Sequence, residues 1–294
     1  MTTKQEISRP DKILYPETGY TKADLAQYYE AVADWMLPHL AGRPLVLHRF
    51  PDGIETEGFY QKQAPAHTPD FVDTTTVASG NRRGSVRHLV VGDVDTLRFL
   101  ANQACLELHR WLSHADRIDN PDLMVLDIDP PDGVDIALLR RTVRKSVDLL
   151  AELGLAPHVM TTGGSGYHVV APLDGSADFD EVRALARAVA DRLAADAPDE
   201  LTTEQRIGAR RGRIFLDTNR NAYGQTAVTP YSPRARPGAP VATPIEPEEL
   251  SKVRPDGYDL RSIRRRLAQK GDPWADLHTE AVPAADVRER LDPR

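Results

Sequence analysis

Two aspartates two positions apart, Asp127 and Asp129, close an apolar run that reads DLMVLDID. If the run is a buried strand, both carboxylates lie on one face, because side chains two apart on a strand share a face. Carboxylates held this close repel each other, and hard divalent cations such as Mg²⁺ or Mn²⁺, which prefer oxygen ligands, relieve the repulsion. The pair is therefore a candidate metal site; two loop acids beside Pro130 and Pro131 are the alternative interpretation.

A second apolar run, RIFLD, also ends in an acid, Asp217. Joined to the first two, this carboxylate would complete a site for two metal ions about 3.5–4 Å apart, which stabilises the attacking and leaving oxygens in phosphoryl transfer. Taken alone, Asp217 is better explained as a cap of the turn at Thr218 and Asn219.

A glycine-rich segment, TTGGSGYH over residues 161–168, joins two expected strands. Three glycines let the backbone turn tightly and present N–H groups to an anion, and Ser165 and His168 add donors for a phosphate. No lysine follows and no helix is expected to begin here, so the segment is not a Walker loop. A plain β-hairpin explains the glycines equally well.

Positive charge gathers around Asp217, where seven arginines between residues 204 and 236 face only Glu204 and Asp217. Guanidinium groups beside metal-bound carboxylates suit a polyphosphate, and a solvated basic face is the alternative. The whole chain of 294 residues carries 37 Lys and Arg against 44 Asp and Glu, a net charge of −7. This balance excludes a generic basic coat for nucleic acid, but it leaves room for a focused site.

The single cysteine, Cys105, excludes an internal disulfide and a cysteine-rich zinc site. The first residues, MTTKQEISRPDKILYP, contain no apolar signal-like segment, and no run approaches the roughly 18 apolar residues of a membrane span. We therefore expect a cytoplasmic protein with no membrane partner.

The elements that must position these residues follow from hydrophobic periodicity. A capping box at Thr21 and Asp24 predicts a helix as far as Pro38, and apolar spacing predicts a second helix from Asp95 to Trp111, which would carry Cys105 on its face and His109 at its end. Further helices are expected over residues 135–154, 179–195, 247–253 and 260–269, and strands over 44–49, 85–91, 122–129, 157–162, 167–173, 213–217 and 226–231. The proline-rich stretch 230–247 is expected to be a tether. The irregular alternation predicts an α+β or mixed-sheet α/β fold with two lobes.

Taken together, these segments resemble the polymerase domain of bacterial ATP-dependent DNA ligase D, a member of the archaeo-eukaryotic primase superfamily that acts in non-homologous end joining. The resemblance covers nearly the whole chain. It is carried by PDKILYPETGYTKADLAQYY, GFYQKQAP, NQACLELH, LMVLDIDP, TTGGSGYHVVAPL and RIFLDTNRNAYGQTAVTPYSPRARPGAPVATPI. It implies a single primase-polymerase domain over residues 1–294, with an N-terminal lobe to about residue 115, a catalytic lobe from about residue 116, and no ligase or nuclease domain.

The resemblance also implies roles for single residues. The catalytic, metal-binding carboxylates would be Asp127, Asp129 and Asp217. The residues that bind the incoming nucleotide would be Thr162, Ser165, Gly166, His168, His109, Arg220 and Arg234. The residues that bind DNA would include Lys12 and Lys22, in a pocket for the 5′-phosphate of a downstream strand, and Arg49. Phe59 and Tyr60 would stack on the template, and Arg210 would lie near the primer end. From residue type alone, Phe59 and Tyr60 would be one core ring and one surface ring, with a base-stacking platform as the alternative.

The implied activity is template-directed transfer of nucleotides from NTP or dNTP at gaps and broken ends that carry a 5′-phosphate, with ribonucleotides preferred. Two ions, Mn²⁺ or Mg²⁺, would serve it: Asp127 and Asp129 would bridge both, and Asp217 would bind mainly the ion at the primer 3′-hydroxyl. The rival functions are a metal-dependent phosphoesterase that uses the same acids to cleave, and a non-catalytic module that binds DNA ends.

The sequence departs from the family in two side chains, because Ser165 and His48 stand where ligase-linked relatives often have lysine. The nearest strings to the K-x-D-G nucleophile motif of a covalent ligase begin at Phe50 and Arg254, and both lack the lysine. We therefore expect Ku and a separate ATP-dependent DNA ligase as partners, and a nucleoid-associated location within the cytoplasm.

Overall fold

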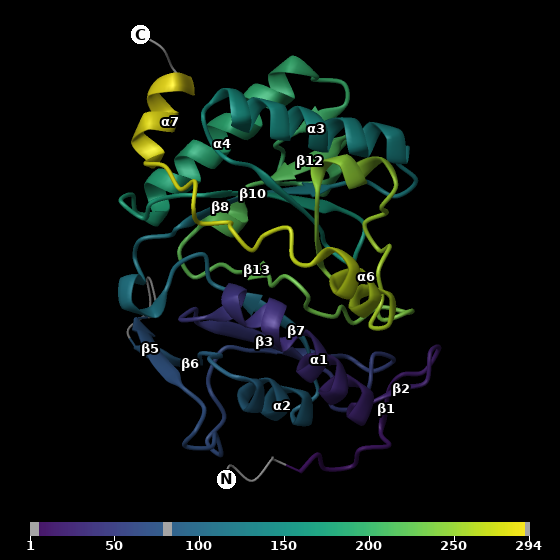
Figure 1. Cartoon of the computed structure of the whole chain (residues 1–294). Helices are drawn as coiled ribbons and strands as arrows, with labels where there is room; N and C mark the ends of the chain where they lie inside the picture. The colour runs from purple at the N-terminus through teal and green to yellow at the C-terminus, as the bar shows by residue number, and fades with distance from the viewer. Residues whose placement is uncertain (1–5, 79–83, 292–294) are drawn as a thin grey trace.

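The computed structural model describes residues 6–78 and 84–291. Its two larger sheets lie one above the other in Figure 1, each with helices packed on it. The N-terminal elements of the chain lie in the lower half, and its C-terminal helix lies in the upper half. The predicted mixed α/β fold is confirmed.

The lower sheet has the strand order β13-β7-β3-β4, and two helices pack against it through a shared apolar core. Helix α1 begins at the predicted capping box, in which Thr21 and Asp24 each accept a bond from the other's backbone N–H. The elements of this half are β3 (Leu45–Arg49), β4 (Phe59–Gln61), β7 (Cys105–Arg110), β13 (Ala227–Val228), α1 (Lys22–Leu40) and α2 (Val94–Asn102). The hairpins β1 (Ile13–Tyr15) with β2 (Tyr20–Thr21), and β5 (Thr74–Ala78) with β6 (Ser85–Leu89), complete it.

The upper sheet has the strand order β11-β12-β8-β10-β9-β14, and its pairs are antiparallel except for β11 with β12. Helices α3, α4 and α7 lie above this sheet in Figure 1. The elements of this half are β8 (Leu123–Asp129), β9 (His158–Thr161), β10 (Tyr167–Pro172), β11 (Leu201–Thr202), β12 (Ile214–Asp217), β14 (Thr243–Ile245), α3 (Ile136–Glu152), α4 (Phe179–Asp196) and α7 (Ala284–Leu291). The segments between these elements contain short helices, namely η1 (Ala115–Arg117), α5 (Ile207–Arg210), η2 (Asn219–Asn221), η3 (Pro247–Ser251) and α6 (Ser262–Lys270).

The helix predicted from Asp95 to Trp111 is wrong in its second half. Helix α2 ends at Asn102, Ala104 turns with a positive φ of 52°, and the next residues form strand β7. Strand β7 lies inside the lower sheet, between β3 and β13, and all six of its residues are buried, polar and apolar alike. A strand buried on both faces shows no alternation of core and solvent positions, and Leu100, Ala104 and Leu108 fall at helical spacing, so periodicity misassigned it. Cys105 therefore lies buried in a sheet, and His109 does not end a helix.

The proline-rich stretch 230–247 is not a tether. It contributes strand β14 to the edge of the upper sheet, and Tyr231 and Val241 are fully buried in the core of the lower half. Pro244 is tolerated because it lies in an edge strand, where a missing N–H breaks no interior ladder. The chain thus passes from β12 of the upper sheet to β13 of the lower sheet and back to β14 of the upper sheet, so residues after 226 belong to both halves.

Buried polar contacts tie the two halves together. Arg43, between α1 and β3, is 1% exposed and donates two bonds of 2.7 Å to the carboxylate of Asp122, which precedes β8. The hydroxyl of Tyr28 on α1 donates to the carbonyl of Tyr231 over 2.7 Å. The division of the chain into lobes near residue 115 stays a prediction. Within the described ranges, none of the helices has both the length and the apolar character needed to cross a membrane.

Candidate active site

Three adjacent strands of the upper sheet bring the predicted acids together. Asp127 on β8 is the cross-strand partner of Asp217 on β12 and of His168 on β10, so the three form one row across the sheet. Asp129 lies two residues beyond Asp127 on the same face of β8. The three carboxylates each offer an oxygen within 4.8 Å of the others. The placement predicted for Asp127 and Asp129 at a strand end therefore holds, and Asp217 joins them.

Positive groups compensate the most buried of these carboxylates. Asp127 is 3% exposed, with Nε of Arg220 at 3.1 Å from one oxygen and Nε2 of His168 at 3.3 Å from the other. Burial alone would raise the pKa of Asp127, but the charges and hydrogen bonds of His168 and Arg220 outweigh it and lower that pKa. Burial, followed by the charges of Asp127 and Asp217, raises the pKa of Asp129 to about 6. The cluster thus holds negative charge that the neighbouring side chains only partly balance.

The donor set fits hard divalent cations, because three carboxylates supply only oxygen ligands at close range. Burial raises the pKa of Asp129 most, the carboxylates of Asp127 and Asp217 raise it further, and a bound cation would offset these effects by favouring the charged form. Nδ1 of His168 is buried without a hydrogen-bond partner among the described residues, so this site also leaves one polar atom for a bound group.

The turn after β12 positions Arg220. Asn221, fully buried, accepts a bond from the N–H of Val125 over 2.8 Å and donates to its carbonyl over 2.7 Å, as a neighbouring strand residue would. These bonds hold η2 against β8 and so place Arg220 beside Asp127. The sequence analysis missed Asn221, because a single asparagine in a turn carries no distinguishing pattern.

A cavity of about 100 Å³ opens beside the acid row. It collects every residue predicted for the nucleotide: Thr162, Ser165, Gly166, His168, His109, Arg220 and Arg234. Asp127 and Asp129 also line it, together with Gly164, Val228 and Arg236. Arg236 is the polar residue that residue-by-residue prediction omitted, although the arginine-rich stretch that contains it was noted.

The glycine-rich turn between β9 and β10 is built for close packing. A Cβ on Gly166 would lie 2.3 Å from the carbonyl oxygen of Ile128, so glycine is required for β10 to approach β8. The N–H of Gly163 donates to the carbonyl of Pro255, and the N–H of Gly164 donates to Oγ1 of Thr162. Since two of the three glycine N–H groups are used within the protein, the side chains around the cavity supply most of its anion-binding capacity.

A second cavity, of about 200 Å³, lies in the lower half and is strongly basic. It is lined by Lys12 and Lys22, as predicted for a phosphate pocket, and also by Arg49, Ser8 and Arg9. Lys22 is buried and donates to the carbonyl and hydroxyl of Ser8, over 2.8 and 3.0 Å. Burial, with the charges of Arg9, Lys12 and Arg49, lowers the pKa of Lys22. Cations held together in this way attract an anion.

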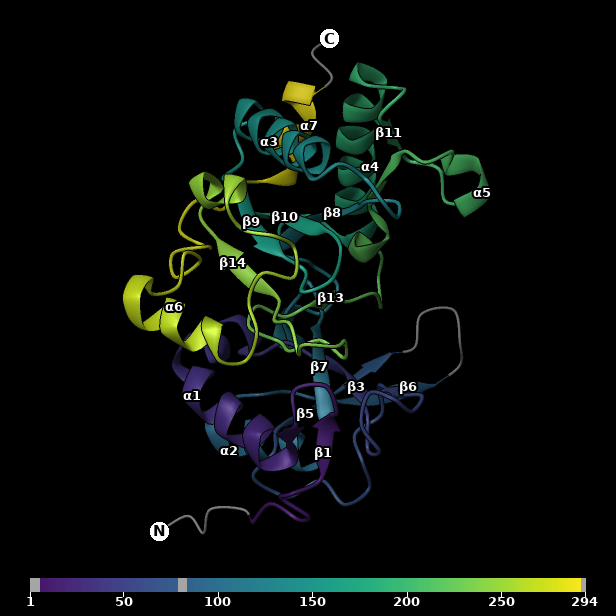
Figure 2. The same ribbon diagram turned by 90° about the vertical axis from the view of Figure 1, so that its right-hand side faces the viewer.

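The predicted aromatic pair lies on the edge strand β4, and both rings are exposed, Phe59 by 46% and Tyr60 by 61%. The interpretation as one core ring and one surface ring is therefore wrong. Tyr60 stacks on His48 with ring centres 4.0 Å apart, and Arg49 lies 5.3 Å from the centre of the Phe59 ring. Arg210 lies apart from both cavities, on helix α5, which projects from the body in Figure 2, and its guanidinium covers the ring of Phe215.

The paired sheets, the acid row and the adjoining basic cavity define a metal-dependent nucleotidyltransferase of the primase-polymerase type. Comparison with known proteins gives the particular family. The model of the LigD primase-polymerase domain matches residues 21–274, and the chain belongs to that family. The predicted family and enzyme class are confirmed.

Several curated relatives take part in non-homologous end joining. The chain is 35% identical over 290 residues to the multifunctional non-homologous end joining DNA repair protein LigD of Mycobacterium tuberculosis, covering 95% of this chain and 38% of that protein. It is 30% identical over 277 residues to the bifunctional protein LigD of Bacillus subtilis, covering 94% of this chain and 44% of that protein. The chain therefore spans about two fifths of the length of these relatives.

A solved structure agrees with this assignment. The polymerase domain of Mycobacterium tuberculosis ligase D, in complex with DNA, superposes with a TM-score of 0.87 at 32% identity. The match covers 94% of this chain and 99% of that chain.

Proposed function

We propose that the protein is a template-directed polymerase that adds nucleotides to a 3′-hydroxyl at gaps and broken DNA ends. The observation that carries this proposal is the cavity lined by Asp127, Asp129, Arg220, Arg234 and Arg236, with Asp217 in the same carboxylate cluster beside it. Carboxylates suit catalytic cations, and a ring of guanidinium groups beside them suits the phosphates of a nucleotide.

The carboxylate cluster and the side chains of the cavity would have separate roles. Asp127, Asp129 and Asp217 would hold two divalent cations, Mn²⁺ or Mg²⁺, whose chemistry lowers the pKa of the attacking hydroxyl and neutralises the leaving pyrophosphate. Arg220 and Arg234 neutralise charge on the triphosphate in a partly desolvated site, where fixed cations act most strongly.

The remaining nucleotide contacts come from the glycine-rich turn and β7. His168 offers its unpartnered Nδ1, and the exposed Ser165 adds a hydroxyl. Thr162 and Gly166 hold the turn, since the Thr162 hydroxyl donates to the Gly166 carbonyl over 2.9 Å. His109 borders the cavity from the lower sheet.

On the DNA side, Lys12, Lys22 and Arg49 would hold the 5′-phosphate of the downstream strand in the second cavity. Phe59 and Tyr60 would stack on a template base, for which their exposed rings are suited. Arg210 would lie near the primer strand, on the projecting helix α5. The likeness to a polymerase domain solved with DNA supports this arrangement.

The finer features of the function are also proposals. We infer a preference for ribonucleotides, efficient use of Mn²⁺, and action with Ku and a separate ATP-dependent DNA ligase in the cytoplasm, at the nucleoid. Residues 1–294 would act as one domain, whose N-terminal lobe holds the phosphate pocket and whose catalytic lobe begins near residue 116.

The test is primer extension on a gapped duplex with a labelled primer, comparing Mg²⁺ with Mn²⁺ and NTP with dNTP. We expect the primer to lengthen by templated nucleotides, and Asp127→Ala to reduce the rate at least about 10³-fold in a variant that still folds. Primer shortening would instead identify a phosphoesterase. Binding of DNA ends without any change in primer length would identify a non-catalytic module.

A further inference from the structure

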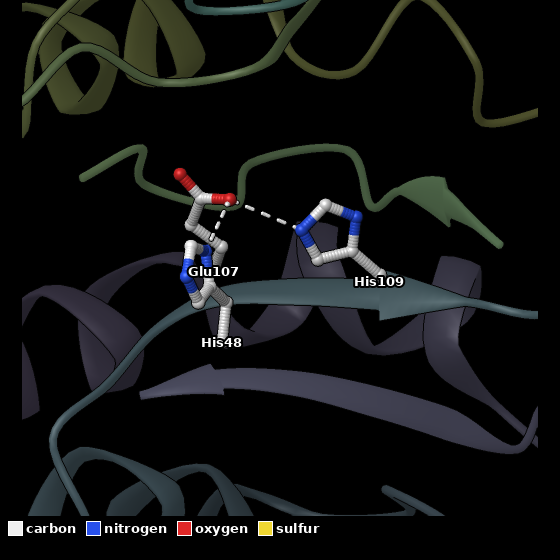
Figure 3. Close-up of side chains that lie close together, drawn as sticks. All are labelled: His48, Glu107 and His109. Carbon is white, nitrogen blue, oxygen red and sulfur yellow. Dashed lines mark hydrogen bonds and ion pairs between the residues drawn. The ribbon is translucent and has the colours of Figure 1, made fainter. Parts of the chain in front are cut away.

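Glu107, in the middle of β7, is a buried acid that lines neither cavity. It is 4% exposed, and hydrogen-bond donors from separate segments surround its carboxylate. Nδ1 of His48 and Nε2 of His109 lie 3.2 and 3.1 Å from one oxygen, as Figure 3 shows. Nε of Arg234 and the backbone N–H of Ala235 lie 3.1 and 2.9 Å from the other. One oxygen therefore faces two histidine nitrogens, and the other accepts a backbone hydrogen bond and forms an ion pair with Arg234.

Glu107 is an ionised carboxylate held by its neighbours. Burial alone would raise the pKa of Glu107, but the hydrogen bonds of His109 and His48 and the charge of Arg234 outweigh burial and lower it far below its usual range. A buried charge of this kind is costly unless it is paired, so the carboxylate and its partners fix one another's positions.

One set of contacts leads from Glu107 to the exposed aromatic platform. Tyr60 on β4, His48 on β3 and Glu107 on β7 are successive cross-strand partners, so they form a row across the lower sheet. His48 stacks on Tyr60 with an angle of 10° between the rings, while its Nδ1 faces Glu107. The carboxylate thus fixes His48, and His48 supports one face of Tyr60.

The other contacts lead from Glu107 to the nucleotide cavity. Arg234 and His109 both line that cavity, and both meet the Glu107 carboxylate. Arg234 also donates to the carbonyl of Thr162 in the glycine-rich turn. The rings of His109 and Tyr60 meet edge to face with their centres 5.8 Å apart, so the two sets of contacts also touch each other directly.

A metal ion is the other ligand chemistry that His48, Glu107 and His109 could serve, since one donor atom from each lies within 4.8 Å of the others. The surroundings favour hydrogen bonding instead. An ion bound there would sit close to the guanidinium of Arg234, which already pairs with Glu107, and it would displace contacts that satisfy both carboxylate oxygens.

We propose that Glu107 is a positioning residue that holds the platform at Tyr60 and the nucleotide contacts at Arg234 and His109 in one fixed geometry. It would thereby couple the template base to the incoming nucleotide. This inference rests on the proposed polymerase function. Because the Glu107 carboxylate contacts His48, His109, Arg234 and Ala235 and none of the three aspartates, loss of its charge acts on nucleotide binding more than on the chemical step.

The test is Glu107→Gln, which keeps the shape and removes the charge. We expect the KM for the nucleotide in primer extension to rise about tenfold, the effect of losing one charge-assisted contact, with kcat within about threefold of the wild type. Glu107→Asp, which keeps the charge, should recover part of the loss. The matched control is Glu249→Gln, at a glutamate paired with Arg266 and Lys270, neither of which lines a cavity that binds nucleotide or DNA in this proposal. It should leave the KM unchanged.

Coupling is measured by a double-mutant cycle of Glu107→Gln with Tyr60→Leu. Non-additive effects on the KM, by a factor of three or more, support the proposal, and simple additivity overturns it. An unchanged KM in Glu107→Gln, or an equal rise in Glu249→Gln, also overturns it. If Glu107→Gln fails to fold, the cycle of His48→Ala with Tyr60→Leu decides in the same way.

Two further measurements separate this inference from its premises. If the wild type extends no primer, the proposed function fails, and binding of a fluorescent ATP analogue with Mn²⁺ still compares wild type with Glu107→Gln. Calorimetric titration of Mn²⁺ and Zn²⁺ into an Asp127→Asn, Asp129→Asn, Asp217→Asn variant tests the metal alternative. Stoichiometric binding that Glu107→Gln abolishes would show a metal centre and overturn the positioning role.

Discussion

The ammonium group of Lys22 offers the sharpest test of the DNA-binding cavity. It is buried at the start of α1, where its hydrogen-bond partner is Ser8, and burial together with the charges of Arg9, Lys12 and Arg49 lowers its pKa. Lys12, in contrast, already has a counter-charge, because its Nζ lies 2.5 Å from the exposed carboxylate of Asp52. A phosphate in this cavity would therefore gain more from Lys22 than from Lys12.

The perturbation is Lys22→Met, which keeps an unbranched apolar stem and removes the charge. A charge-assisted hydrogen bond contributes about 1.5–3 kcal/mol, and each 1.4 kcal/mol is a factor of ten in affinity. Affinity for gapped DNA with a 5′-phosphate should therefore fall about 10–100-fold in Lys22→Met. Lys12→Met should lose less than about tenfold, because its exposed ion pair with Asp52 already holds part of its charge.

The assay is fluorescence anisotropy at fixed salt, on matched gapped duplexes with and without the 5′-phosphate. The duplex without the phosphate is the internal control, and Lys22→Met should change its affinity by less than about twofold. The ratio of the two affinities should approach one in Lys22→Met. A ratio equal to that of the wild type, or an equal loss on both duplexes in a variant that unfolds normally, would refute the assignment of this cavity to a phosphate.

Three further outcomes follow from the structure. With a chelator present, Asp129→Asn should raise the free energy of unfolding at pH 8 by about 1–3 kcal/mol, because a folded-state pKa raised to about 6 makes the charged form of Asp129 unfavourable. In urea unfolding, this gain should vanish below about pH 4. A gain at every pH would show that the charge of Asp129 is not its cause. Asp122→Asn should lower the unfolding free energy by about 3 kcal/mol, since it leaves the buried Arg43 without its charged partner; a urea-measured loss below 1 kcal/mol would contradict the pairing. Tyr60→Leu should weaken binding of template DNA by about 1–3 kcal/mol, as expected for the loss of a base-stacking ring. If anisotropy gives Tyr60→Leu and the wild type the same affinity for template DNA, Tyr60 does not have that role.

The parts of the site that the sequence predicts are those with a local pattern. The acids Asp127 and Asp129 stand two apart at the end of a run of apolar residues, and that run forms strand β8, as predicted. The turn at residues 162–166 is likewise set by its own glycines, one of which the packing of Ile128 requires. In both cases neighbouring residues determine the geometry, so the sequence sufficed.

Contacts between distant segments could not be predicted in the same way. The basic cavity includes Ser8 and Arg9, which precede the first strand and carry no motif, and the cavity forms only because α1 brings Lys22 beside them. Asn221 is similar, since the role of its amide depends on the backbone N–H and carbonyl of Val125 on β8, to which it hydrogen-bonds. These residues depend on strand order and packing, which one sequence does not reveal.

The wrong helix concealed one contact network for a specific reason. In a helix, residues two apart point to different sides, so Glu107 and His109 would have been unrelated. In strand β7 they share a face, as Asp127 and Asp129 do in β8, and cross-strand pairing then adds His48 and Tyr60 just as it adds Asp217 and His168 to the acid row. Two pairs at the same spacing thus produce two rows of side chains, one on each sheet, and both rows border the same cavity through His109 and Asp127. The spacing that predicted the acid row therefore also predicts the Glu107 network once residues 105–110 are recognised as a strand.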